Sequence, residues 1–88
     1  MSQYKINNNL LIQKLNGKTV LFDNTISIVY TLNETAHYIF SQLKRNVSKK
    51  KILQHMMLRY KVKENKLSRD IDEVIQYFVK KKILSPKL

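Results

Sequence analysis

The side chains that could do chemistry are few in this 88-residue chain, and they are not grouped as an active site would require. The two histidines, His37 and His55, lie in separate segments with helical periodicity, and the chain contains no cysteine. Metal sites in proteins draw on clustered ligands at characteristic spacings, such as two histidines one helical turn apart. We therefore expect no metal site, no disulfide and no cysteine nucleophile.

The carboxylates offer one cluster, formed by Asp70, Asp72 and Glu73. A pair of carboxylates can act as a general acid and base, but acidic residues near the start of a helix are also favoured by its dipole. The single glycine, Gly17, excludes a glycine-rich loop that would cradle phosphates, and no nucleophile motif is present. The sequence predicts a non-enzymatic protein with no cofactor.

The formal charge of +11 comes from 17 basic and 6 acidic residues. Such an excess suits a nucleic acid or an anionic membrane surface, yet it is also typical of a lysine-rich genomic composition. Only three of the basic residues are arginine, the residue whose fork matches phosphate best. No apolar run approaches the roughly 20 residues of a membrane span, and the start of the chain lacks a signal-peptide pattern. We expect one cytoplasmic domain over residues 1–88, with no membrane partner.

The first third of the chain has the pattern of three antiparallel strands, at 10–15, 18–22 and 27–32. Asn16-Gly17 joins the first two, and this dipeptide is the strongest short signal for a hairpin turn. Asp23-Asn24-Thr25 is a candidate for the second turn. These strands would form a small antiparallel sheet. One face of the sheet would pack against the rest of the chain, and the other would stay partly exposed to solvent.

From Asn33 the apolar period changes to that of helices. We expect a first helix capped by Asn33 and ended by Asn46 and Val47, and a second helix capped by Ser48. A third helix is expected to start near Ser68 and to end around residue 81, with Pro86 stopping any continuation of the tail. The predicted fold class is α+β, winged-helix-like, with three strands followed by three helices.

A basic chain of this order could be a small winged-helix DNA-binding regulator. Recognition helices of that class contact base edges with their N-terminal residues. In this chain that stretch holds Asp70, Asp72 and Glu73, which would face a polyanion. DNA binding is therefore disfavoured, and we keep it as the alternative hypothesis. A plain oligomerisation domain is a third hypothesis.

Three segments of the chain share their order and spacing with a known family. The first runs from Phe22-Asp23 to the Leu32-Asn33-Glu34-Thr35-Ala36 junction. The second comprises Ser48, Ile52-Leu53 and Tyr60, and the third runs from Asp70 to Leu84. Together these segments resemble the PqqD-like family. The spacing around Leu32 and Asn33 is more similar to the standalone lasso-peptide type. Two positions depart from the family pattern, because Ser27 and Lys82 stand where the family usually has glycine.

The resemblance implies a precursor-peptide recognition element of ribosomal peptide maturation. Such a module is non-catalytic, binds the leader part of a precursor peptide as an added strand, and presents it to a maturation enzyme. That enzyme is a leader peptidase, a cyclase or a radical-SAM enzyme.

The third strand would be the docking edge, since it carries neither proline nor charge between Ser27 and Asn33. A strand-edge dimer or the C-terminal tail are the other occupants to consider. The predicted peptide-binding residues lie on this strand and on the third helix: Ile28, Val29, Tyr30, Thr31, Leu32, Asp70, Ile71, Val74 and Ile75.

Overall fold

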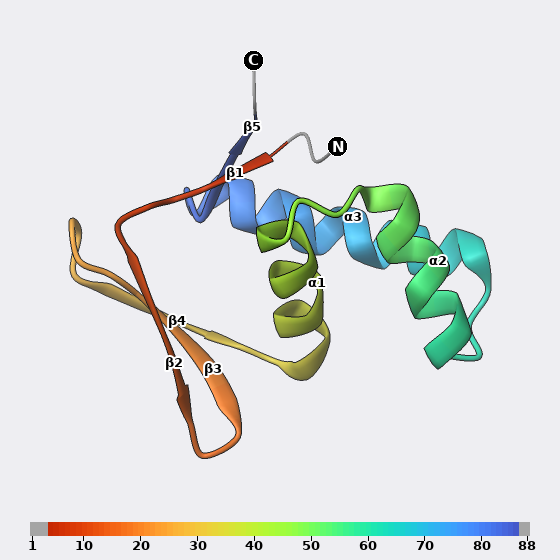
Figure 1. Ribbon diagram of the computed structural model, residues 1–88, viewed down its shortest axis with the longest axis horizontal. Coiled ribbons are helices and arrows are strands. Elements are labelled where there is room, and N and C mark those ends of the chain that lie inside the picture. The colour runs from red at the N-terminus through yellow and green to blue at the C-terminus, as the bar shows by residue number, and fades with distance from the viewer. Residues whose placement is uncertain (1–3, 87–88) are drawn as a thin grey trace.

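The computed structural model describes residues 4–86 and has the mixed α+β architecture that the sequence predicts. A three-stranded antiparallel sheet lies beside three helices, and a short two-stranded sheet lies across the end of the third helix (Figure 1). The elements in chain order are β1 (Tyr4–Ile6), β2 (Leu10–Leu15), β3 (Lys18–Asp23), β4 (Ile28–Leu32), α1 (Glu34–Lys44), α2 (Lys49–Arg59), α3 (Glu64–Lys80) and β5 (Leu84–Pro86).

The hairpin between β2 and β3 confirms the turn that Asn16-Gly17 predicts. Both residues have positive φ, 52° and 78°, which is the requirement of a type I′ turn. Leu15 and Lys18 are the partners that flank this two-residue turn. The turn thereby fixes the register of the whole β2–β3 ladder.

The second turn, between β3 and β4, is organised by the buried side chain of Asp23. One carboxylate oxygen accepts from the Thr25 backbone N–H at 2.9 Å, and the other accepts from the Asn7 side-chain amide at 3.1 Å. Asp23 therefore ties the turn to the segment that follows β1. Ser27 then enters β4 with φ 54°, in the left-handed region that glycine occupies most easily.

Helices α1 and α2 begin where the sequence predicts. The Asn33 side chain accepts from the Ala36 N–H at 2.8 Å, and Ser48 accepts from the Lys51 N–H at 3.3 Å. At the other end of α1, Asn46 has φ 67°, and the Val47 N–H reaches back to the Gln42 carbonyl at 3.0 Å. These are the features of a Schellman C-cap, which explains why the helix stops there.

Helix α3 begins at Glu64, four residues before the predicted start near Ser68. Its N-cap is Lys63, which makes no side-chain capping bond, so the sequence carries no cap signal at the true start. Glu64 suits the positive end of the helix dipole. The predicted end near residue 81 is confirmed, and Lys82 with φ 60° closes a second Schellman cap through the 2.8 Å bond from the Ile83 N–H to the Phe78 carbonyl.

The core lies between one face of the three-stranded sheet and the inner faces of all three helices. Phe40 of α1 and Phe78 of α3 meet edge to face with their ring centroids 5.8 Å apart. The buried apolar residues are Leu21, Tyr30, Leu32, Ile39, Phe40, Leu43, Ile52, Met56, Leu67, Ile71, Ile75, Phe78, Ile83 and Leu84.

The pairing of β1 with β5 is a feature that the sequence analysis did not predict. Tyr4 lies opposite Pro86 and Ile6 lies opposite Leu84 in an antiparallel pair. Pro86 therefore sits in the final strand instead of following an irregular tail. Because β5 is paired with β1, residues 84–86 do not occupy the edge of β4.

Candidate functional site

Strand β4 is an edge of the three-stranded sheet, whose order is β2-β3-β4. Within the described residues no strand pairs with its outer side. Proteins usually protect such an edge with charge, proline or a covering segment. β4 has neither charge nor proline, so its outer side is open to an added strand.

The register identifies which backbone groups of β4 point outward. In an antiparallel ladder, hydrogen-bonded and non-hydrogen-bonded pairs alternate, and the Leu15–Lys18 pair that flanks the two-residue turn is a bonded one. Counting along β3, every second residue bonds to β2 and the others bond to β4. Thr19, Leu21 and Asp23 therefore bond to β4, and their partners there are Leu32, Tyr30 and Ile28. This leaves the N–H and C=O groups of Val29 and Thr31 directed at the open edge.

A hollow of about 290 Å³ lies between the end of β4 and the middle of α3. We call it the edge groove, and its lining residues come from β4, the start of α1 and α3: Thr31, Leu32, Asn33, Ala36, Glu73, Val74 and Tyr77. The lining combines apolar and aromatic side chains with the polar groups of Thr31, Asn33 and Glu73. The phenol of Tyr30, which donates to the Lys81 carbonyl at 3.3 Å, holds β4 to the C-terminal end of α3.

The structure separates the predicted strand residues into two sets. Ile28, Val29 and Thr31 are exposed, with Val29 retaining 57% of its surface. Tyr30 and Leu32 turn their side chains into the core. Their side chains face inward because their register partners, Leu21 and Thr19, lie on the covered face of the sheet.

The predicted residues of α3 are also divided. Val74 lines the edge groove, whereas Ile71 and Ile75 are 0% and 3% exposed and belong to the core. Asp70 is half-buried, lies outside the groove lining, and accepts from the Lys66 ammonium one turn earlier at 3.4 Å. The structure therefore brings Thr31, Leu32 and Val74 together at one groove.

The predicted peptide-binding residues did not include four residues of the groove: Asn33, Ala36, Glu73 and Tyr77. The helical period contained the signal for two of them. Residues 67, 71, 75 and 78 form the buried stripe of α3, so 73, 74 and 77 fall on the adjoining face. A tyrosine beside that stripe, 42% exposed, marks the border between core and groove.

The carboxylates of α3 differ in their surroundings. The Lys49 ammonium at the start of α2 forms an ion pair with Asp72, which ties the two helices together. Glu73 is the carboxylate in the lining of the edge groove. In the described part of the chain, no three histidine or carboxylate side chains gather as metal ligands would, and every helix there falls short of the length and apolarity needed to cross a membrane.

Residues 18–84, which include β4, the edge groove and all three helices, match the family described as coenzyme PQQ synthesis protein D (PqqD). The chain belongs to the PqqD family. No curated protein matches its sequence.

Two solved structures share this PqqD-family fold. One is lasso peptide synthetase B1 complexed with the leader peptide, with a TM-score of 0.90, 20% identity, and coverage of 97% of this chain and 100% of that chain. The other is TbiB1 in complex with the TbiA(beta) leader peptide, with a TM-score of 0.84, 18% identity, and coverage of 92% and 94%.

The two departures from the family's glycine pattern have a backbone explanation. Ser27 and Lys82 both have positive φ, 54° and 60°. This PqqD-family chain thus adopts the left-handed conformation at both positions without glycine, the residue that adopts it most easily, at some cost in backbone strain.

Proposed function

We propose that this PqqD-family protein is a non-catalytic module that captures the leader segment of a ribosomally made precursor peptide. The leader adds as a strand along β4, and the module presents it to a maturation enzyme. The observation that carries the proposal is the open edge of β4 beside an apolar groove. The leader peptides present in the two similar solved structures support the same class of ligand.

The backbone of β4 would set the register of the leader. Val29 and Thr31 offer their outward N–H and C=O groups, and a leader strand pairs with them irrespective of its sequence. Selectivity then comes from side chains. Alternate leader residues point toward the covered face of the sheet, and the residue opposite the end of β4 would enter the edge groove against Val74 and Tyr77.

The partner that uses the captured leader would be a peptidase, a cyclase or a radical-SAM enzyme. The proposal gives this chain the role of binding, assigns the chemistry to that partner and needs no cofactor on this chain. The backbone anchoring leaves the outward-facing leader side chains accessible to a second protein.

The alternative function, DNA binding, is disfavoured by the charges on α3. Asp70, Asp72 and Glu73 lie together on that helix, and only the first two have lysine partners within the described residues. A recognition helix carrying these groups would bring carboxylates toward phosphates.

The test begins with a search of the neighbouring genes for a short precursor peptide, followed by an NMR titration with its synthetic leader. We expect the largest amide shift changes in residues 28–33 and 73–77. Changes confined to the lysines at 49–51, or no binding, would overturn the proposal.

A salt series separates leader binding from DNA binding. A protein that contacts six or more phosphates of duplex DNA should lose about 10³-fold in affinity between 50 and 200 mM salt. Leader binding should lose only a few-fold, mainly through the association rate.

A further inference from the structure

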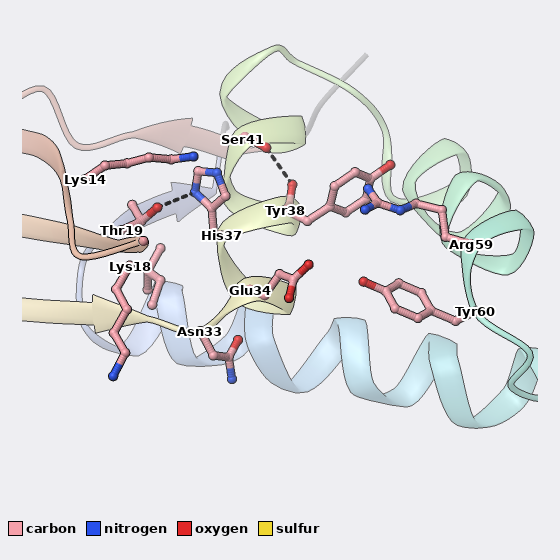
Figure 2. Close-up of a pocket in the computed structure, with 12 residues that line it drawn as sticks. Lys14, Lys18, Thr19, Asn33, Glu34, His37, Tyr38, Ser41, Arg59 and Tyr60 are labelled. Atoms are coloured by element: carbon pink, nitrogen blue, oxygen red, sulfur yellow. Dashed lines mark hydrogen bonds between the residues drawn. The ribbon is translucent and has the colours of Figure 1, made fainter.

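A second hollow, of about 640 Å³, lies next to the edge groove, and the two share Leu32 and Asn33. We call it the basic pocket. Figure 2 shows that its walls come from the β2–β3 hairpin, one face of α1 and the C-terminal end of α2. Its lining residues are Lys14, Gly17, Lys18, Thr19, Leu32, Asn33, Glu34, His37, Tyr38, Ser41, Arg59 and Tyr60.

Three cations line the basic pocket, against one carboxylate. Lys14 and Lys18 come from the hairpin and Arg59 from the end of α2, whereas Glu34 is the acidic member. Within residues 4–86, the ion pairs use Lys49 and Lys66, so none of the three pocket cations has a carboxylate partner there. The pocket therefore has an unmatched positive charge that an anion would neutralise.

The guanidinium of Arg59 is positioned by aromatic rings. Its central carbon lies 4.8 Å from the centre of the Tyr38 ring and 5.9 Å from that of Tyr60. Stacking of this kind restrains the side chain and leaves its N–H groups available, which suits bidentate binding of a carboxylate. On the opposite wall, the Thr19 hydroxyl and the His37 Nδ1 atom form a 2.7 Å hydrogen bond with each other.

We propose that the basic pocket binds an acidic side chain, aspartate or glutamate, of the same peptide that pairs with β4. This inference rests on the proposed function and adds a second specificity site to it. An extended peptide that leaves the edge groove at Asn33 must pass the first turn of α1 to reach the pocket. A helix is about 10–12 Å across and an extended chain rises about 3.3 Å per residue. The acidic residue therefore lies about three to four residues from the one in the groove.

The charge balance of the pocket favours a single carboxylate over a polyanion. Glu34 lines the same pocket as the three cations, and its carboxylate points toward the side of the pocket where Arg59 and Tyr60 lie (Figure 2). It would repel a phosphate dianion or a nucleic-acid backbone more strongly than one carboxylate. A monovalent acidic side chain on a peptide satisfies Arg59 without crowding negative charge against Glu34.

The experiment selects ligands from an mRNA-display library of random 20-residue peptides against the full chain. NMR titration of the enriched peptides identifies those that shift amides of β4 and α3. Among them we expect a glutamate or aspartate enriched about three to four residues from the apolar anchor. If no enriched peptide reaches β4, the proposed function fails and this inference with it. If peptides bind β4 without an acidic preference, only the inference fails.

Charge reversal then tests the contact directly. Arg59→Glu should weaken binding of a selected glutamate-bearing peptide about tenfold, as loss of a charge-assisted contact implies. The peptide with lysine in place of that glutamate should recover most of the loss on the variant and bind the parent protein poorly. Lys14→Glu, on the hairpin, is a second variant that does not disturb the tyrosine stack.

The matched control is Lys50→Glu, which makes the same change in net charge at an exposed position of α2 outside the pocket. It should change affinity by about twofold or less at physiological salt, where distant charges are screened. Equal effects of Lys50→Glu and Arg59→Glu, or no rescue by the lysine peptide, would show that only overall charge matters and would overturn the inference.

Discussion

The direction of single backbone N–H groups in β4 can be tested with two prolines at neighbouring positions. Ile28 and Val29 are both exposed, at 44% and 57%, but the register directs the Ile28 N–H inward to β3 and the Val29 N–H outward. Proline removes the donor at either site. Val29→Pro should therefore damage leader binding, and Ile28→Pro should damage stability.

The size of each effect follows from one hydrogen bond, worth about 0.5–1.5 kcal/mol net. Val29→Pro should weaken leader binding by at least about 2- to 13-fold, with an added loss because the ring obstructs the incoming strand. Ile28→Pro removes a ladder bond inside the sheet. At about 4–8 °C per kcal/mol for a domain of this size, its melting temperature should fall by about 2–12 °C.

The assays are fluorescence anisotropy with a labelled leader for affinity and circular dichroism melting for stability. The Tm of Val29→Pro should stay closer to the parent value than that of Ile28→Pro. The reasoning is wrong if Val29→Pro stays folded and binds the leader normally. It is equally wrong if the two variants exchange phenotypes, because that result would place the Ile28 N–H at the edge.

Three further predictions concern stability and are checked by urea denaturation. Lys82→Gly should stabilise the fold by about 0.5–1 kcal/mol because the left-handed strain disappears, whereas Lys81→Gly, at φ −86°, should not. Asn33→Ala should cost about 1 kcal/mol through loss of the 2.8 Å cap of α1, an effect that Asn33→Asp should largely avoid. Asp23→Ala should cost about 1–3 kcal/mol, since the Thr25 N–H and the Asn7 amide lose the buried carboxylate that accepts from both, and an unchanged midpoint would contradict that role.

Short sequence patterns were sufficient to predict the turns and helix starts that are fixed by hydrogen bonds within a few residues. Asn16-Gly17 predicts its hairpin, and Asn33 and Ser48 predict the starts of two helices, because each signal acts through a bond within a few residues. The start of α3 was misplaced because its true N-cap, Lys63, carries no capping side chain. The β1–β5 pair could not be predicted from local pattern, because each strand has three residues and the partners lie at opposite ends of the chain.

The candidate site was predictable as a region more than as a set of side chains. The uncharged composition of β4 indicates an open edge, but which of its residues face inward depends on the register across β3. Ile71 and Ile75 were assigned to the groove although they complete the core. An apolar stripe on a helix has the same sequence pattern whether it packs against the core or against a ligand. The position of Tyr77 at the edge of this stripe is the sequence feature that indicates the groove.

The short β1–β5 pair has a consequence for protein engineering. Because Tyr4 lies opposite Pro86, the two ends of the described chain leave the molecule side by side, away from the junction of β4 and α1 (Figure 1). A few added residues would join them into a cyclic chain, and new ends could be opened in the exposed turn at 24–27. The same geometry would let the module be inserted into a surface loop of a carrier protein, where both junctions lie side by side and the open edge of β4 stays free.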